Sequence, residues 1–215
     1  MNDVIISPSI LSADFSNLEK SVEAVEDTEW LHLDVMDGHF VPNLTFGPCV
    51  IGSIRDKSDH VFDTHLMISN PGKYVEDFAE AGSDIITFHT EAVENVGEVI
   101  DDIKATGTKA GLSLKPGTEF SAVEEYLPKI DLILIMTVEP GFSGQEFMDE
   151  VVPKIKKARE TIDRLGLNID IAVDGGISPE NAGKVVENGA NVLVSGSSVF
   201  RGDTVKNLKE LRDSF

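Results

Sequence analysis

Short apolar runs rich in β-branched residues alternate with stretches of helical spacing along the whole chain. The apolar runs predict strands at residues 4–7, 30–35, 60–65, 84–89, 109–114, 132–138, 169–173 and 191–195. The stretches that follow them predict helices at residues 16–26, 48–56, 71–81, 93–105, 121–126, 145–165, 179–188 and 204–214. Eight strand-then-helix units in 215 residues predict one (β/α)8 TIM-barrel domain that spans residues 1–215.

The residues between these elements favour the barrel over an open, doubly wound sheet. Pro71 and Pro179 lie where helices are expected to begin. Glycines stand where four of the helices are expected to end, at Gly82, Gly107, Gly166 and Gly189. A doubly wound sheet commonly carries G-x-G-x-x-G after its first strand, whereas here that strand leads into SPSILSADF. The phosphate-loop pattern G-x-x-x-x-G-K-[ST] is also absent from the sequence.

Histidines and carboxylates concentrate where the predicted strands end, which is the functional face of a (β/α)8 barrel. Side chains alternate along a strand, so His32 and Asp34 point the same way, as do Asp63 and His65 on the next strand. Asp174 ends the seventh strand. One His-x-Asp pair alone is more often a hydrogen-bonded pair. Together, two imidazoles and two carboxylates predict a site for one divalent metal ion, with Zn as the first choice and Fe, Mn or Co as alternatives.

Three methionines share this end of the predicted barrel. Met36 and Met67 continue the faces of the two His/Asp pairs, and Met136 lies on the sixth strand. Methionine is commonly a filler of hydrophobic cores. At this position the three side chains also predict an apolar wall that keeps water out of an active site. His89, at the end of the fourth strand, is predicted to make a structural hydrogen bond rather than to act as a fifth ligand.

Glycine-rich segments follow the last three predicted strands. They read PGFSGQ at 140–145, DGGIS at 174–178 and SGSSVF at 195–200. Backbone N–H groups beside helix N-termini bind phosphate without a cationic side chain. The loops after strands seven and eight are a common phosphate site in barrels. One such segment alone is an ordinary turn, but the three together predict a phosphate site.

A net charge of −20, from 38 acidic and 18 basic residues, limits the partners of the protein. Nucleic acids and anionic membranes both require a basic surface, so neither is expected as a partner. The acidic residues form either an ordinary solvated surface or an adaptation to high salt. An anionic substrate then has to bind through a metal ion, backbone N–H groups or helix N-termini.

The remaining composition predicts a cytoplasmic protein. No apolar run is long enough to cross a bilayer, and no secretory signal follows Met1. Cys49 is the single cysteine, which excludes an internal disulfide and fits a reducing compartment. Nothing near Cys49 indicates an activated nucleophile, so it is expected to serve in packing.

Six motifs occur in the same order as in a known family: SPSILSADF, HLDVMDGHFVPNLTFGP, THLMISNP, VEPGFSGQEF, VDGGI and SGSSVF. From about residue 6 to residue 200 the chain resembles the ribulose-phosphate 3-epimerase family. The resemblance implies a (β/α)8 barrel that interconverts D-ribulose 5-phosphate and D-xylulose 5-phosphate in the pentose phosphate pathway. It implies metal ligation by His32, Asp34, His65 and Asp174. It implies substrate binding by Ser9, His65, Gly141, Phe142, Ser143, Gly144, Gly175, Gly176, Gly196 and Ser197.

One residue departs from the family pattern. The sixth loop of the family usually reads Gly-Phe-Gly-Gly-Gln, whereas this chain has Ser143 at the middle glycine. If that position requires a positive φ, serine would be strained by about 1 kcal/mol.

Epimerisation beside a ketone requires one base on each side of the carbon atom. Asp34 and Asp174 come from strands far apart around the barrel, so they are predicted to be the two catalytic bases that flank an enediolate intermediate. The divalent ion is predicted to stabilise the enediolate charge as a Lewis acid. The two carboxyl groups are expected to titrate as a coupled pair.

Three other functions remain open from the residues alone. The first is a 3-epimerase of a ketohexose 6-phosphate such as allulose 6-phosphate, because the sequence does not reveal which loop contacts select the sugar. The second is a Schiff-base aldolase that uses Lys115, at the end of the fifth strand. The third is a sugar-phosphate binding protein without catalysis. A homo-oligomer is expected because barrels often associate, and Phe40 and Phe46 are candidates either for an interface or for a cover over the site.

Overall fold

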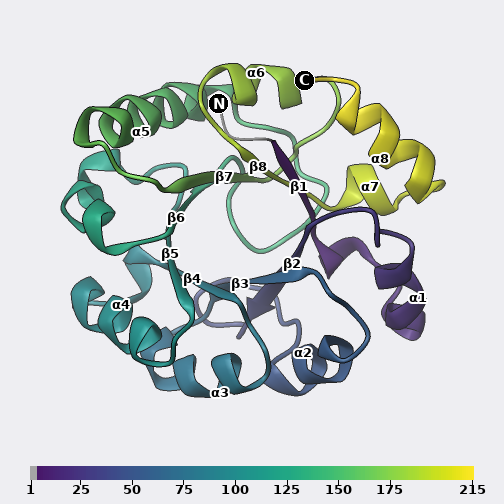
Figure 1. Cartoon of the computed structure of the whole chain (residues 1–215), viewed down its shortest axis with the longest axis horizontal. Helices are drawn as coiled ribbons and strands as arrows, with labels where there is room; N and C mark the ends of the chain where they lie inside the picture. The colour runs from purple at the N-terminus through teal and green to yellow at the C-terminus, as the bar shows by residue number, and fades with distance from the viewer. Residues whose placement is uncertain (1–3) are drawn as a thin grey trace.

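Eight parallel strands curl into a nearly closed ring with helices around its outside (Figure 1). The computed structural model describes residues 4–215, so the first three residues of the expected domain lie outside the described part. The strands are β1 (Ile5–Pro8), β2 (Trp30–Met36), β3 (Val61–Met67), β4 (Ile85–His89), β5 (Lys109–Leu114), β6 (Leu132–Met136), β7 (Asp170–Asp174) and β8 (Val192–Ser195). Their order is β1-β8-β7-β6-β5-β4-β3-β2, and a bridge between Ser9 and His32 joins the two ends of the sheet. The predicted barrel is confirmed.

A helix or a 3-10 turn follows each strand. The helices are α1 (Leu18–Glu23), α2 (Pro48–Arg55), α3 (Val75–Glu80), α4 (Val96–Ala105), α5 (Val152–Leu165), α6 (Ala182–Glu187), α7 (Ser197–Phe200) and α8 (Thr204–Arg212). Short 3-10 turns lie at Ile10–Ser12, Phe15–Asn17, Pro71–Tyr74, Thr90–Ala92, Phe120–Ala122, Glu124–Lys129 and Asp149–Val151. Gly166 ends α5 in the left-handed conformation, as expected for a helix C-cap.

Two predicted helices differ from the observed elements. The helix predicted at 145–165 begins only at Val152, because the Gln145 side chain instead donates hydrogen bonds to the carbonyls of Glu139 and Phe142 and holds a loop. The stretch 121–126 forms 3-10 turns, and Pro128 lies inside the second of them. Helix α7, which the sequence pattern did not predict, lies inside SGSSVF.

The alternation of side chains along the strands divides the core into two parts. On β2, for example, Leu31 and Leu33 face the surrounding helices and join the large outer core. Trp30 faces the inside of the ring and joins an inner cluster built largely from β6, β7 and β8. On β2, β3 and β4 polar side chains take the place of this inner apolar filling, and His32, His65 and His89 are all fully buried there. The fold therefore places buried titratable groups on one side of the ring.

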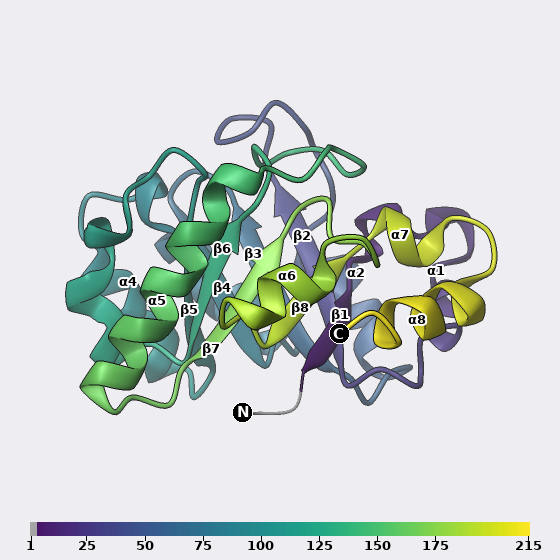
Figure 2. The ribbon, with the colours of Figure 1, turned by 90° about the horizontal axis from the view of Figure 1, so that it is seen from above.

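The loops at the C-terminal ends of the strands form one face of the barrel. Figure 2 shows the loops after β2 and β6 rising above the barrel on the same side. The Asn43 side chain donates a hydrogen bond of 2.8 Å to the carbonyl of Gly141, which joins these two loops. The face that carries function in barrels is therefore covered by segments far apart in the sequence.

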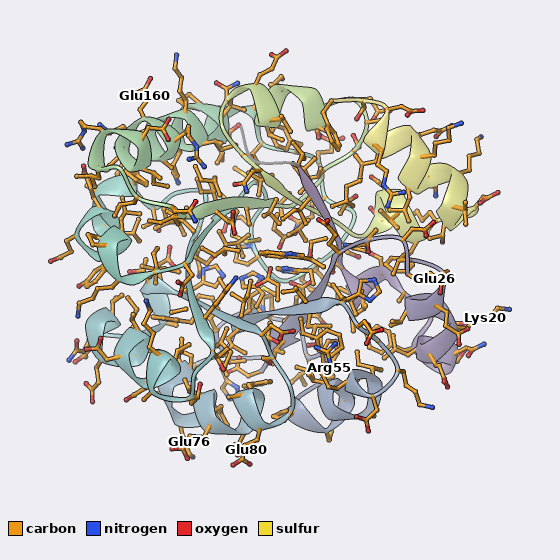
Figure 3. The ribbon with its side chains drawn as sticks, viewed as in Figure 1. Lys20, Glu26, Arg55, Glu76, Glu80 and Glu160 are labelled. Atoms are coloured by element: carbon orange, nitrogen blue, oxygen red, sulfur yellow. The ribbon has the colours of Figure 1, made fainter. Side chains whose placement is uncertain are left out.

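The surface of the barrel is strongly charged. Figure 3 shows Lys20, Glu76, Glu80 and Glu160 on the helices, pointing away from the ring. Cys49 is exposed, so the expectation that it serves in packing is wrong. Within residues 4–215, no helix combines the length and the apolar character that a bilayer crossing requires.

Candidate active site

Four side chains from β2, β3 and β7 converge at the C-terminal end of the barrel. They are His32, Asp34, His65 and Asp174, whose ligand atoms all lie within 4.8 Å of one another. Their parity explains the convergence, because inward-facing residues at matching heights on neighbouring strands meet inside the ring. The register pairs Asp34 with His65 across β2 and β3. The predicted cluster is thus formed by the fold.

The spacing within the cluster matches what a divalent cation requires. The Nε2 atom of His32 lies 3.4 Å from Nδ1 of His65 and 3.4 Å from Oδ1 of Asp34. Oδ2 of Asp174 lies 3.8 Å from His32 Nε2 and 3.7 Å from His65 Nδ1. Tetrahedral zinc, with ligands at about 2.0–2.1 Å, places neighbouring ligand atoms about 3.3–3.4 Å apart. The residues present therefore fit such an ion in both donor type and spacing.

A second set of contacts fixes the orientation of His32. Its Nδ1–H donates to Oδ2 of Asp63 at 2.8 Å, which turns Nε2 toward the cluster. Thr87 donates to the other oxygen of Asp63 at 3.2 Å. The lack of a side chain at Gly111 makes room for this threonine, since a Cβ atom there would lie 2.1 Å from Thr87 Oγ1. Carboxylate partners of this kind are typical of metal-binding histidines.

His65 is held from its other nitrogen. His65 Nε2 lies 2.9 Å from Nε2 of His89, and His89 Nδ1 lies 3.2 Å from Oε2 of Glu91. The predicted structural role of His89 is therefore confirmed: it is hydrogen-bonded on both sides and lies behind the cluster.

The two carboxyl groups of the cluster differ in their affinity for a proton. Burial alone would raise the pKa of Asp34, but the neighbouring His32 and His65 outweigh it and hold that pKa far below its ordinary value. Burial and the nearby Asp34 carboxylate raise the pKa of Asp174 to about 6. Burial would lower the pKa of His32, yet Asp34 and Asp63 raise it well above its ordinary value. Asp34 is thus held in its ionised form, whereas Asp174 has the higher affinity for a proton.

A cleft opens above the cluster and encloses about 500 Å³ of empty space, counting space open to solvent. Asp34 and Asp174 line it, and Ser9 donates a hydrogen bond of 2.5 Å to Oδ2 of Asp34. His32 and His65 are fully buried and are not among the residues that line the cleft. Its walls include three buried methionines: Met36, Met67 and Met136.

The glycine-rich loops after β6, β7 and β8 line the other end of the cleft. All the substrate-binding residues predicted there are brought together: Gly141, Phe142, Ser143, Gly144, Gly175, Gly176, Gly196 and Ser197. The loops pack tightly, since a Cβ atom on Gly176 would lie 2.7 Å from the backbone nitrogen of Phe147. Gly141 and Gly144 have positive φ. Ser143 does not, because Asn70 is the only non-glycine residue with positive φ in the described part of the chain, so the condition for strain at Ser143 is not met.

Several residues of the site were missed or left open by the sequence pattern. Leu11, Val138 and Gln145 also line the cleft. Lys115 does not line it; its ammonium group lies 4.1 Å from the centre of the Phe40 ring, which gives no support to a Schiff-base aldolase.

Solved structures share the architecture at low sequence identity. A mutant tryptophan synthase α-subunit from Pyrococcus furiosus superposes with a TM-score of 0.72 at 15% identity and covers 98% of each chain. A 3-hexulose-6-phosphate synthase superposes with a TM-score of 0.68 at 16% identity and covers 99% of this chain and 97% of that one. At this identity the comparison supports the barrel fold alone.

Curated relatives share far more of the sequence. Ribulose-phosphate 3-epimerase of Synechocystis sp. is 49% identical over 92% of this chain and 88% of its own length. The enzyme of the same name from Bacillus subtilis is 45% identical over 97% and 98%, and the chloroplastic enzyme of Arabidopsis thaliana is 49% identical over 93% and 72%. A sequence model of the ribulose-phosphate 3 epimerase family matches residues 5–200. With this match and these relatives, the chain belongs to the ribulose-phosphate 3-epimerase family of isomerases.

Proposed function

We propose that this chain interconverts D-ribulose 5-phosphate and D-xylulose 5-phosphate by proton transfer at C3, with Asp34 and Asp174 as the two bases. The observation that carries the proposal is the pair of inward carboxyl groups, from strands β2 and β7, that line one cleft next to two buried imidazoles. Nothing in the cleft favours a ketohexose phosphate over the pentose.

The reaction requires the two carboxyl groups in opposite protonation states. The ionised Asp34 takes the C3 proton of one epimer, and the Asp174 carboxyl group gives a proton to the opposite face of the planar enediolate. The reverse reaction exchanges these roles. Ser9 orients Asp34 through its hydrogen bond to Oδ2. Met36, Met67 and Met136 exclude water, which would otherwise reprotonate the intermediate.

We assign a divalent ion, zinc in the first place, to His32, Asp34, His65 and Asp174. When bound, the ion supplies Lewis-acid stabilisation of the negative charge on the substrate oxygens. Two imidazoles and two carboxylates suit zinc, and Fe, Mn and Co accept the same donors.

The phosphate group belongs at the glycine-rich end of the cleft, where three loops meet (140–145, 174–178 and 195–200). Backbone N–H groups bind the dianion there, so the acidic surface does not prevent recognition. Phe142 is 54% exposed at the rim, in position to cover the bound sugar.

The proposal is tested by following deuterium from the solvent into the sugar phosphate. In D2O the enzyme should incorporate solvent deuterium at C3 of D-ribulose 5-phosphate while it forms D-xylulose 5-phosphate. Asp34→Asn and Asp174→Asn should each abolish the conversion. Asp170→Asn is the matched control, because Asp170 begins β7 at the opposite end of the same strand. Conversion without exchange at C3, or normal conversion by either cluster variant, would contradict the proposal.

We further propose that residues 1–215 form one domain that acts in the cytoplasm as a homo-oligomer. The single sheet of eight strands supports one domain, and the free Cys49 fits a reducing compartment. The Arabidopsis relative carries the word chloroplastic in its name, so the compartment varies among relatives. Sedimentation of the purified protein measures the oligomeric state.

A further inference from the structure

A hydrogen-bonded chain runs from the proposed metal cluster outward to the loop after β5. It passes from His65 to His89 and on to Glu91, with atom separations of 2.9 Å and 3.2 Å. Both histidines are fully buried, and the Glu91 side chain is 22% exposed. The proposed mechanism involves neither His89 nor Glu91. In a buried chain of hydrogen bonds, each contact needs one donor and one acceptor, so the positions of the protons along the chain depend on one another.

Carboxylates lie at both ends of the chain, since Oδ1 of Asp34 lies 3.2 Å from Nδ1 of His65. When a metal ion binds Nδ1 of His65 in place of this contact, Glu91 at the outer end sets the order. The ionised Glu91 can only accept, so His89 donates from Nδ1–H and a neutral His89 then has a lone pair at Nε2. The short contact between the two Nε2 atoms needs one donor, which must be His65. A neutral His65 that carries its hydrogen on Nε2 presents the lone pair of Nδ1 to the cluster, as metal binding requires.

Glu91 is itself fixed by the loop after β5. Its Oε1 atom accepts a hydrogen bond of 2.8 Å from the backbone N–H of Lys115 and another from the hydroxyl of Thr118. The Lys154 ammonium group holds the same loop by donating to the carbonyls of Lys115 and Pro116, at 3.1 Å and 2.7 Å. Glu91 therefore has one oxygen committed to an obligatory donor, the Lys115 N–H, and the other directed at His89.

We propose that Glu91 is a positioning residue for the epimerase: through His89 it selects the tautomer of His65 whose Nδ1 binds the metal ion. This inference rests on the assignment of His65 as a metal ligand under the proposed function. Asp63 performs the corresponding task for His32, from the neighbouring strand and on the opposite ring nitrogen. The two imidazoles are thus preset by separate carboxylates, one directly and one through a second histidine.

Glu91→Gln is the decisive variant because the loop after β5, which contacts this side chain, determines the orientation of the new amide group. The Lys115 N–H requires the amide oxygen at the Oε1 position, which turns the NH2 group toward Nδ1 of His89. His89 then has to carry its hydrogen on Nε2, and His65 is forced to place its own on Nδ1, facing the cluster. Zinc affinity, measured by chelator competition, should fall about ten- to a hundredfold. Glu94→Gln removes the same charge from an exposed position in the segment between β4 and α4 that also carries Glu91, and it should leave the zinc affinity unchanged.

Imidazole nitrogen NMR of the zinc-loaded protein gives a readout that a merely structural role would not move. In the unmodified enzyme we expect His89 to carry its hydrogen on Nδ1, and in Glu91→Gln on Nε2. An Nε2–H tautomer of His89 in the unmodified enzyme overturns the proposal even if the variant fails to fold. Unchanged zinc affinity in a folded Glu91→Gln also overturns it, and leaves the metal site intact. Zinc that binds without contacting Nδ1 of His65 overturns the metal assignment itself.

Discussion

Asp174 differs from the other acidic residues of the barrel because its neighbours favour its proton. Its pKa is raised to about 6 by burial and by the Asp34 carboxylate, whereas the pKa of Asp34 is held low by two histidines. A pair of carboxyl groups that differ in this way can act as base and acid in the same turnover. The proposed acid–base chemistry therefore depends on the difference in pKa between Asp34 and Asp174.

Asp174→Asn should lower kcat at least ~10³-fold, because the amide can neither exchange the proton nor donate a charged oxygen to the cluster. Steady-state kinetics together with bound-metal analysis measure the effect, and Asp170→Asn serves as the control in the same strand. A variant that kept both its metal and near-normal turnover would remove Asp174 from the mechanism.

Metal affinity should rise with pH from 5 to 7. The pKa of Asp174 is raised to about 6 and the pKa of His32 lies well above its ordinary value, so protons compete with the cation for both groups across this range. Zinc titrations at pH 5, 6 and 7, in buffers of equal ionic strength, should show increasing affinity and proton release at the lower pH. An affinity that is constant from pH 5 to 7 contradicts the raised pKa.

At the scale of the elements, strand alternation made much of the site predictable from sequence. His32, Asp34 and His65 were placed on one face because the period of a strand is local and regular. The partners of these residues were not predictable in the same way. The role of Glu91 depends on a 3-10 turn and on contacts with a distant loop. The start of α5 depends on the hydrogen bonds of Gln145 within its own loop.

The position of Gly111 on β5 gives a prediction at this scale. Gly111→Ala should destabilise the protein by ~1–3 kcal/mol, because the new Cβ atom overlaps Thr87 and displaces the support of Asp63. Gly117→Ala, which has open space around its Cβ position, should leave stability unchanged or slightly higher. Urea unfolding of both variants makes the comparison, and equal midpoints would contradict the close packing of Gly111 against Thr87.

At the scale of the whole molecule, the charge is the dominant feature. The net charge of −20 opposes the compact state through self-repulsion, with side chains such as Glu76 and Glu160 directed outward (Figure 3). The proposed phosphate site would rely on backbone N–H groups of the loops, which need no cationic side chain on this acidic protein.

Added salt should therefore stabilise the fold, because screening shortens the range of the repulsion. Tm should rise between low salt and about 0.5 M NaCl, where the Debye length falls to a few ångströms. A sucrose series separates this effect from general stabilisation by cosolutes. A Tm that stays constant or falls with NaCl would contradict a role for surface repulsion.

The central claim is that one divalent ion, held by four side chains from three strands, is required for epimerisation. A zinc titration of chelator-treated enzyme, with turnover of D-ribulose 5-phosphate recorded at each step, tests it most directly. Activity should start near zero, rise linearly and reach a plateau at one zinc per chain. Full turnover before any metal is added, or a plateau that does not correspond to one ion per chain, would contradict the account.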